Sequence, residues 1–494
     1  MAAYAAVVSL MNVIYNIQNH PQFSISLFDE QQAESLGEKL DFLVDFIESN
    51  HSHELLESEI ATAAYAAEDV IESHIVDQIH SGSISSLDLQ TIIKDMDYVK
   101  DKVVNFKEEE GGLSKVHRQY SMSATSSTPP ITGGGKSTKM VGFEEELIQL
   151  LDALTGRQSS LQIIPIVGMG GIGKTTLARN AYESRLIVNH FDICAWATIS
   201  QEYSLKEIFS KLLSPENGQS ANEQQLSQKL YQSLIGRRYL IILDDIWSID
   251  AWEKMMIFFP DNNNGSRIIL TTRLSNVAGH FGSSYFSKKF LDEDQSWKLF
   301  CEKAFPHKEV CPPELEKLGK KVAKKCKGLP LLIVVIGGLL KSKTQELWEN
   351  IANNINSILT SEEDTQRLDI LSLSYSHLPA HLKACFLYMG IFREDCEILV
   401  SVIIKLWIAE GFIKPNKTQS LEDVAECYLK ELVDRNLLLV GGLKLNGKIK
   451  TCTIHDLLRD LCIKTAQKEK FLYLIRFCGS LSGINKACRR ILCQ

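Results

Sequence analysis

One stretch of the sequence, GMGGIGKTT (168–176), has the residue types and spacing of a phosphate-binding loop. Its glycines let backbone N–H groups curl around a phosphate with no Cβ in the way, and a helix start behind the loop adds a favourable dipole. Lys174 is expected to reach the phosphates, and the Thr175 hydroxyl to hold Mg²⁺. A weaker candidate, GGGKS (133–137), has Pro130 where the spacing requires glycine, so Lys136 is excluded as a nucleotide ligand.

Acidic and basic residues follow two further apolar runs. YLIILDDIW (239–247) delivers Asp244 and Asp245 to the end of a strand. Asp244 is predicted to coordinate Mg²⁺ through water, and Asp245 to act as a catalytic acid that orients an attacking water. GSRIILTTR (265–273) ends in Arg273, a cation that could sense a γ-phosphate. The alternatives are two solvated turn aspartates and an arginine that only caps a strand.

The elements that position these residues predict a multidomain α and α/β protein. Apolar, β-branched runs at 161–167, 193–199, 238–245 and 267–272 alternate with helical segments. Such runs are typical of a parallel sheet covered on both faces, as in a doubly wound domain. Beyond about residue 290 helical patterns dominate.

The first part of the chain predicts a helical bundle or coiled coil. Apolar residues recur there at helical spacing, in one series at Leu36, Leu40, Leu43 and Ile47, and in another at Ile60, Ala64, Ala67, Ile71 and Ile75. Residues 119–139 are rich in Ser, Thr, Pro and Gly, which is typical of a flexible linker.

Composition excludes several classes of protein. The net charge of −8 and the pI near 5.9 argue against broad nucleic-acid binding. The 12 cysteines form no CxxC pair, which indicates reduced thiols in a cytoplasmic protein. The N-terminus does not read as a signal peptide, and the apolar run at 329–340 is shorter than the about 20 residues that span a bilayer.

Taken in order, the motifs resemble those of the NB-ARC domain of plant NLR immune receptors. The series runs GMGGIGKTT, YLIILDDIW, GSRIILTTR, CKGLPL, CFLYMGIF and IHD. The segment AYAAEDVIESHI is similar to the EDVID stretch of the coiled-coil subclass, and MAAYAAVVSLM to Rx-like members from the nightshade family. The resemblance covers almost the whole chain.

The resemblance implies a domain order. It runs as a coiled-coil Rx-N-like helical domain (1–118), a flexible linker (119–139), a P-loop nucleotide-binding domain (140–288), a small helical domain (289–373), a winged-helix domain (374–475) and a tail (476–494) at the expected start of leucine-rich repeats. These repeats are absent from the chain, which reads as a fragment or a truncated product.

The resemblance also implies a set of site residues. The nucleotide-binding residues would be Val141, Gly142, Gly168, Gly170, Gly171, Ile172, Gly173, Lys174, Thr175, Thr176, Arg273, Pro330 and His455. Val141 and Gly142 would line the adenine pocket, Pro330 would pack on the adenine, and His455 would reach the β-phosphate of ADP. On its own, His455 fits a core or surface residue better. Thr175 and Asp244 would hold Mg²⁺. Glu68, Asp69 and Glu72 would form an interdomain contact with the repeats, or be solvated if the repeats are absent.

The function implied is an ADP/ATP-dependent switch of plant innate immunity that leads to hypersensitive cell death. ADP would hold the off state, and ATP would open the molecule for self-association. Expected partners are helper NLR receptors, leucine-rich repeats in trans or in a full-length protein, and a pathogen effector that acts indirectly; nucleic acid is not expected. Such a protein would be cytoplasmic and could associate with membranes on activation.

Some positions depart from the family pattern, and two other functions stay open. Cys194 stands in place of an arginine, residues 392–395 lose a turn proline, and Asn12 and Asn16 interrupt the apolar face of the first helix, which favours a sensor that needs helpers. The alternative functions are a transcriptional regulator that uses its winged helix on DNA and a dedicated ATPase. The apolar segment SVIIKLWIAE (401–410) fits a core better than a DNA groove.

Overall fold

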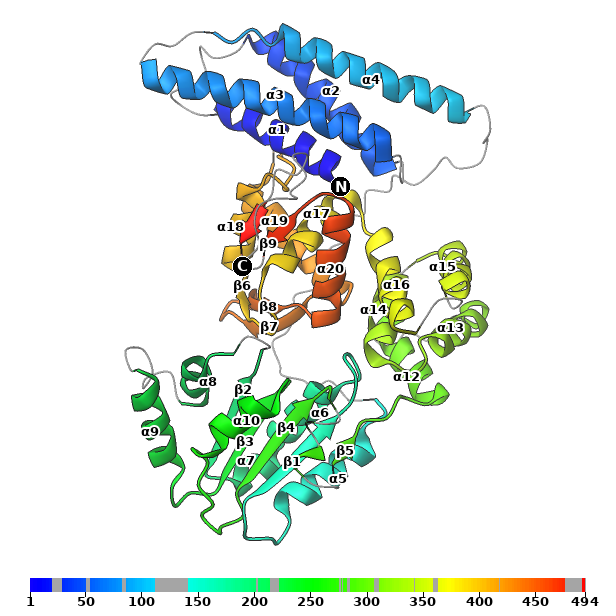
Figure 1. Cartoon of the computed structure of the whole chain (residues 1–494). Helices are drawn as coiled ribbons and strands as arrows, with labels where there is room; N and C mark the ends of the chain where they lie inside the picture. The colour runs from blue at the N-terminus through cyan, green and yellow to red at the C-terminus, as the bar shows by residue number, and fades with distance from the viewer. Residues whose placement is uncertain are drawn as a thin grey trace. The chain divides into compact units, whose positions relative to one another are not determined.

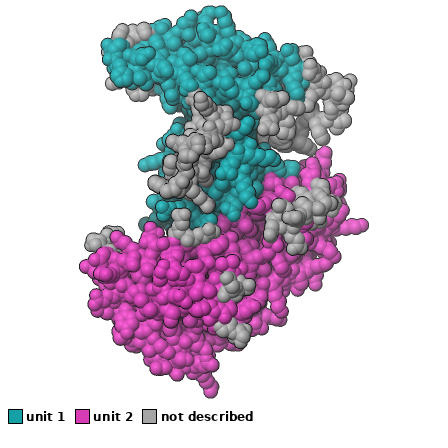
Figure 2. Space-filling model, viewed as in Figure 1, with its two compact units in different colours: residues 1–134, 375–454, 458–494 teal, residues 135–374, 455–457 magenta. Residues whose placement is uncertain are grey.

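A computed structural model of the chain divides into two compact units. Unit 1 comprises residues 1–134, 375–454 and 458–494, and unit 2 comprises residues 135–374 and 455–457 (Figure 2). The structure describes residues 1–19, 29–49, 54–81, 86–111, 141–200, 203–213, 222–274, 277, 279–281, 285–305, 311–341, 343–358, 363–416, 418–475 and 491–493. The predicted linker at 119–139 lies outside these residues.

Unit 2 contains a parallel sheet with the strand order β2-β3-β4-β1-β5 (Figure 1). The strands are β1 (Gln162–Val167), β2 (Ile193–Thr198), β3 (Tyr239–Asp244), β4 (Arg267–Thr272) and β5 (Phe286–Ser287). The first four coincide within a residue or so with the predicted runs. Since β1 pairs with β4 while β3 pairs with β4 on its other edge, the carboxyl ends of β1 and β3 meet at one edge of the sheet.

Helices cover both faces of this sheet, which confirms the doubly wound α/β fold. Alternate residues of β3 enter separate cores: Ile241 packs with α8 (Leu205–Leu212), α9 (Glu223–Leu234) and α10 (Ile249–Met256), whereas Ile242 packs with the other three helices. Those three are α5 (Glu144–Thr155), α6 (Lys174–Tyr182) and α7 (Arg185–His190). A strand has a side-chain period of two, so a continuous apolar run serves both faces.

A group of helices follows the sheet in unit 2. They are α12 (Glu293–Ala304), α13 (Pro313–Lys325), α14 (Pro330–Leu340), α15 (Gln345–Ile358) and α16 (Glu363–Ser376), of which the last residues of α16 belong to unit 1. The apolar run at 329–340 forms α14, which is buried along most of its length. None of the helices in the described parts of the chain combines the length and the apolar character that crossing a bilayer requires.

Unit 1 begins with a bundle of four helices. They are α1 (Ala2–Asn19), α2 (Glu30–Ser49), α3 (Glu54–Ser81) and α4 (Gln90–Gly111). Both predicted apolar series lie in its core, fully or, at Ile75, partly buried. The helical N-terminus is therefore confirmed.

The rest of unit 1 has winged-helix elements. These are α17 (Ala380–Tyr388), the 3-10 helix η3 (Met389–Ile391), β6 (Ile398–Leu399), α18 (Val400–Ala409), α19 (Leu421–Asp434), β7 (Leu439–Leu443), β8 (Ile449–Thr453) and α20 (Asp456–Lys468), whose first two residues belong to unit 2. The strands β9 (Tyr473–Ile475) and β10 (Ile491–Cys493) follow and pair with each other in a separate sheet. The strands β6, β8 and β7 form a small antiparallel sheet. Helix α18 buries Val400, Ile403, Ile404 and Trp407, as its apolar sequence predicts.

Within unit 1 the bundle contacts the winged-helix elements through a buried amide. Asn12 of α1 is 7% exposed, and its Nδ2 donates to the carbonyl oxygens of Ile413 (3.0 Å) and Gly411 (3.4 Å). The polar residue that interrupts the apolar face of α1 is therefore paired inside the unit.

Candidate functional site

The loop between β1 and α6 has the backbone geometry of a phosphate loop. Gly171 and Gly173 have φ angles of +77° and +97°, a region that residues with a Cβ rarely adopt. Helix α6 begins at Lys174, so its first N–H groups face the loop. Ile172 is buried and packs on Gly168, and Thr176 is exposed. The sequence motif therefore folds as its spacing predicts.

Lys174, the first residue of α6, is buried. Its Nζ donates to the carbonyl oxygen of Met169 at 3.2 Å. Burial lowers the pKa of Lys174, and nearby Arg273 lowers it further, while Asp245 and Asp244 act in the opposite direction. A cation with so little solvation is stabilised by an anion close to it.

Asp244 lies at the end of β3, next to Thr175. The Thr175 hydroxyl donates to Asp244 Oδ1 at 3.1 Å, and the Thr271 hydroxyl of β4 donates to the same oxygen. Desolvation, helped by neighbouring Asp245, raises the pKa of Asp244 to about 6. A carboxylate and a hydroxyl in contact are the oxygen ligands that Mg²⁺ prefers, so the donor set fits this ion.

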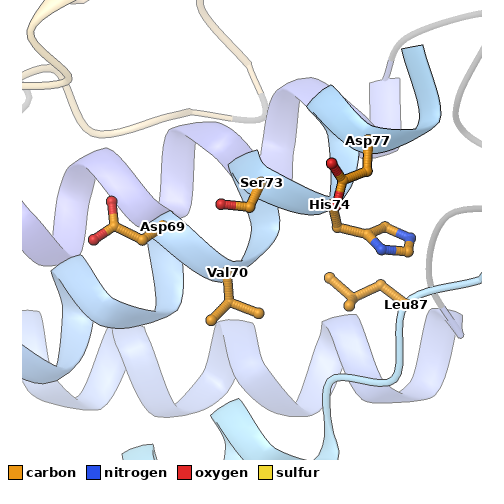
Figure 3. Close-up of a pocket in the computed structure, with 6 residues that line it drawn as sticks. All are labelled: Asp69, Val70, Ser73, His74, Asp77 and Leu87. Carbon is orange, nitrogen blue, oxygen red and sulfur yellow. The ribbon is translucent and has the colours of Figure 1, made fainter. Parts of the chain in front are cut away.

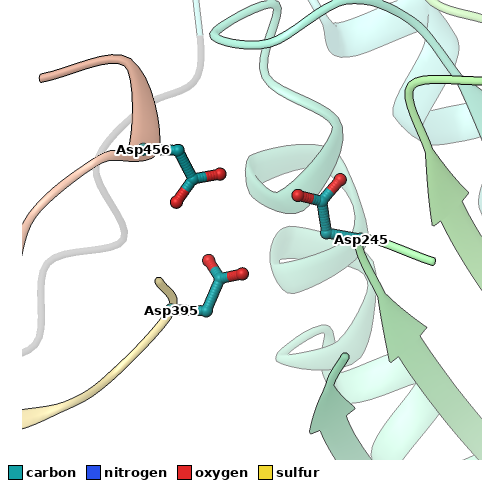
Figure 4. A group of neighbouring side chains, drawn as sticks. All are labelled: Asp245, Asp395 and Asp456. Atoms are coloured by element: carbon teal, nitrogen blue, oxygen red, sulfur yellow. The ribbon is translucent and has the colours of Figure 1, made fainter. Parts of the chain in front are cut away.

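Arg273 connects Asp245 with a residue from far along the chain. Its Nη2 donates to Asp245 Oδ2 at 3.0 Å and also to Asp456 Oδ2. The carboxylates of Asp245 and Asp456 point toward each other (Figure 4). Its guanidinium lies over the Trp247 ring, 4.7 Å from the centroid. Asp245 has a φ of +58°, and its N–H is held by the Thr271 hydroxyl at 2.8 Å. The predicted water-orienting acid is thus engaged by the predicted sensor arginine.

His455 is held as a neutral donor beside this group. Its Nδ1 accepts the backbone N–H of Leu457 at 3.2 Å, so in the neutral ring the proton is on Nε2. Desolvation, with the charges of Arg273 and Lys174 as further causes, lowers the pKa of His455 to about 4. A neutral imidazole with a free Nε2–H suits an anionic oxygen.

Residues from the start and from the middle of unit 2 approach the loop. Val141 is buried, and Gly142 has a φ of +80°, where a Cβ would lie 2.8 Å from the side chain of Leu291. Pro330 is buried at the start of α14, and the next residue, Leu331, donates its N–H to the Gly171 carbonyl at 3.2 Å. The predicted adenine residues and the GLPL segment are therefore parts of one neighbourhood within unit 2.

The three acids of α3 do not share one exposed face. Asp69 and Glu72 are exposed, but Glu68 is 8% exposed and accepts the Ser9 hydroxyl at 2.6 Å. Asp69 lines a shallow cavity of about 370 Å³ with Val70, Ser73, His74, Asp77 and Leu87 (Figure 3). Burial of Glu68 inside unit 1 removes it from an outward acidic surface, contrary to the expectation from sequence.

The sequence does not predict several contacts of this site. It places Asp456 in the IHD motif but not against Arg273, and it assigns no role to Thr271, Trp247 or Leu331. The parallel register offers a signal for Thr271, since β4 lies beside β3 and both end at the same edge. No local sequence pattern predicts the Asp456–Arg273 pair, because the two residues are 183 positions apart.

The charges of the site fit a nucleotide with Mg²⁺. Lys174, Arg273 and His455 would supply donors to a phosphate. The buried Nε of Arg273 is among the described polar atoms that lack a hydrogen-bond partner. An anionic oxygen satisfies such an N–H with a charge-assisted hydrogen bond. Thr175 and Asp244 would hold the metal, as their contact suggests.

Two segments match known domain families. Residues 143–310 match the NB-ARC domain, and residues 391–462 match the disease resistance protein winged helix domain. The first segment covers the phosphate loop, Asp244, Asp245 and Arg273, and the second covers His455 and Asp456. The parallel nucleotide-binding core and the winged helix agree with the fold described above.

The chain is also similar to plant resistance proteins. The chain is 38% identical over 449 residues to the late blight resistance protein homolog R1B-14 of Solanum demissum, covering 88% of this chain and 33% of that protein. It is 38% identical over 428 residues to the late blight resistance protein R1-A of the same species, covering 85% and 32% respectively. The chain thus spans about a third of the length of these relatives.

Among solved structures, a signal transduction ATPase with a tetratricopeptide repeat sensor from Pyrococcus horikoshii is similar in part. The TM-score is 0.42 with 19% sequence identity, over 67% of this chain and 43% of that one.

Proposed function

Taking the chain as part of a plant NLR protein, as the NB-ARC and winged-helix matches support, we propose that it is an ADP/ATP-dependent switch in disease resistance. ADP holds an off state, and ATP permits an on state that self-associates and signals hypersensitive cell death. The resistance named in its relatives supports the biological setting. Hydrolysis is at most slow, because the acid that would orient water is held by an arginine.

The ion pairs of Arg273 carry this proposal. Arg273 bridges Asp245, at the end of a sheet strand, to Asp456, the first residue of α20. His455 precedes Asp456 and offers Nε2–H in the same neighbourhood. Residues 455–457 therefore take part in the nucleotide site, and the bound nucleotide acts on the segment that leads into α20.

Differential affinity then sets the state of the molecule. A ligand shifts an equilibrium only by binding one state more tightly than the other. The neutral His455 donor and the Asp456–Arg273 pair favour the smaller charge of ADP. A γ-phosphate adds negative charge close to Asp245 and Asp456 and competes with them for Arg273, which weakens the hold on residues 455–457. The metal, when bound at Thr175 and Asp244, supplies counter-charge to the phosphates.

The remaining assignments follow from the switch. The expected partners are other copies of the chain, helper NLR receptors, leucine-rich repeats in trans or in a full-length protein, and an effector that acts indirectly. The proposed place of action is the cytoplasm, with membrane association on activation. Asp69 and Glu72 keep their proposed role as interdomain contacts, since both are exposed.

The test is the nucleotide carried through purification. Wild-type chain is expected to hold about one ADP, measured by mass spectrometry after denaturation, and Lys174→Ala to lose it because the loop loses its buried cation. Lys320→Ala is a matched control, since Lys320 is 55% exposed on α13. The proposed switch would be refuted if purified wild-type protein carried no nucleotide and neither ADP nor ATP changed its melting temperature or its assembly. Turnover well above about once per minute would favour a dedicated ATPase instead.

A further inference from the structure

A second buried lysine lies against the phosphate loop. Lys288 follows β5, its side chain is 1% exposed, and its backbone N–H donates to the Val167 carbonyl at 2.8 Å. Its Cβ lies 3.1 Å from the position that a Cβ on Gly168 would take. Lys288 is thereby fixed to the end of β1 and to the first residue of the loop.

The ammonium group of Lys288 lies beside the start of α5. It binds the carboxylate of Glu146, in the first turn of that helix, and it lies over the ring of Phe143. Desolvation lowers the pKa of Lys288, while Glu146 acts to raise it. The Lys288 side chain is buried and that of Glu146 is 26% exposed. Desolvating the lysine costs energy, so the pair is weak support for stability and stronger support for a specific geometry.

Phe143 connects this pair to the other end of the loop. Two of its ring atoms lie 3.3 and 3.4 Å from the position that a Cβ added to Gly173 would take. Phe143 directly follows Val141 and Gly142, the residues proposed to line the adenine pocket. The ring therefore contacts both the Lys288 ammonium and Gly173.

We propose that Lys288 and Glu146 are positioning residues that hold the base-binding strip, residues 141–143, against the phosphate loop. The pair acts through Phe143 and does not touch the nucleotide. It therefore contributes to affinity for the purine and to the choice between adenine and guanine, but not to affinity for the phosphates. This inference rests on the proposed nucleotide site.

The proposal is tested with ligands that occupy different parts of the site: ADP and GDP engage the base-binding strip and the phosphate loop, and pyrophosphate engages the phosphate loop alone. Apo protein is prepared by removing the bound nucleotide, and dissociation constants for ADP, GDP and pyrophosphate are measured by calorimetry. Lys288→Met keeps the length and apolar packing of the side chain and removes its charge. We expect ADP to bind about tenfold more weakly, the ADP-to-GDP preference to shrink, and pyrophosphate to bind within about twofold of wild type.

Matched variants distinguish positioning from a merely structural role. Lys289→Met changes the neighbouring exposed lysine and is expected to match wild type. Glu146→Gln, a milder change at the other member of the pair, is expected to repeat the effect of Lys288→Met. Lys288→Glu combined with Glu146→Lys is expected to recover part of the ADP affinity, because the swapped pair restores the contact.

The outcomes separate this inference from the proposed function. If wild type binds ADP but Lys288→Met and Glu146→Gln leave the ADP constant and the ADP-to-GDP ratio unchanged, the positioning role is wrong. Equal losses for ADP and pyrophosphate would likewise overturn it, since they indicate a general loosening of unit 2. If wild type binds neither nucleotide nor pyrophosphate, the proposed function fails first and this inference with it.

Discussion

The backbone N–H of Leu331 donates a 3.2 Å hydrogen bond to the carbonyl oxygen of Gly171, which joins the start of α14 to the phosphate loop. Gly171 has a φ of +77°, and a Cβ there would lie 2.8 Å from the Cβ of Leu331. Two separate requirements, a left-handed backbone and a close approach, therefore meet at one residue.

Gly171→Ala is expected to destabilise the protein and to weaken nucleotide binding. Left-handed strain costs about 1–2 kcal/mol, and the clash with Leu331 adds about 1–3 kcal/mol. Gly236→Ala is the matched control, because Gly236 has a φ of +73° with no atom within 4 Å of the added Cβ. Thermal melting of the two variants measures the difference. Equal losses in both would mean that the contact with Leu331 contributes nothing.

Much of this neighbourhood could be predicted from the sequence, because its local parts have local signals. Short motifs contain the loop glycines, Lys174 and the strand that ends in Asp244, and each motif determines its own local structure. The approach of Leu331 to Gly171 depends on how α14 packs, and the turn CKGLPL does not encode that distance. Glu146 and Lys288, 142 residues apart, look like ordinary charged surface residues in sequence, yet they meet in a partly buried pair.

Asp456→Asn is expected to speed the release of bound ADP. The amide keeps the shape of the side chain but removes the charge that faces Arg273. Among the described residues, Asp245 is then the one carboxylate that still pairs with Arg273. Loss of a charged partner at a partly buried site costs about 1–3 kcal/mol, which corresponds to roughly fivefold to 150-fold in rate if it acts on the bound state. A chase experiment with a fluorescent ADP analogue measures the rate.

The control for this change is an exposed ion pair of the same unit. Glu293 is 71% exposed and pairs with Lys324, so Glu293→Gln is expected to leave ADP release unchanged. Release from Asp456→Asn at the wild-type rate would show that the Arg273–Asp456 pair does not retain the nucleotide.

Because of His455, the free energy of unfolding is expected to fall as the pH drops below the usual pKa of histidine. Its pKa is about 4 in this structure and about 6.5 in an unfolded chain, so the unfolded chain takes up the proton first. The stabilisation is complete above about pH 6.5 and is lost as the pH falls toward 4. At about pH 5.5 the loss is about 1.4 kcal/mol.

His455→Gln isolates this contribution, because glutamine does not titrate. Melting temperatures between about pH 7.5 and pH 5 are expected to fall less steeply for the variant than for wild type. Identical slopes would show that His455 is not held neutral. Its proposed role as a neutral Nε2–H donor would then be wrong.

Asn12→Ala is expected to loosen α1 from the winged-helix elements of unit 1. The substitution removes the donor that pairs with the carbonyl oxygens of Gly411 and Ile413, and the unmet buried groups cost about 1–3 kcal/mol. Hydrogen exchange in residues 2–19 and 400–413 is expected to quicken. Asn16→Ala changes the same residue type at an exposed position of the same helix and is expected to leave exchange unchanged. Because sequence alone assigned both asparagines to a broken apolar face, different behaviour of the two variants would show that Asn12 is a specific contact; matching behaviour would show that α1 is held by its apolar packing.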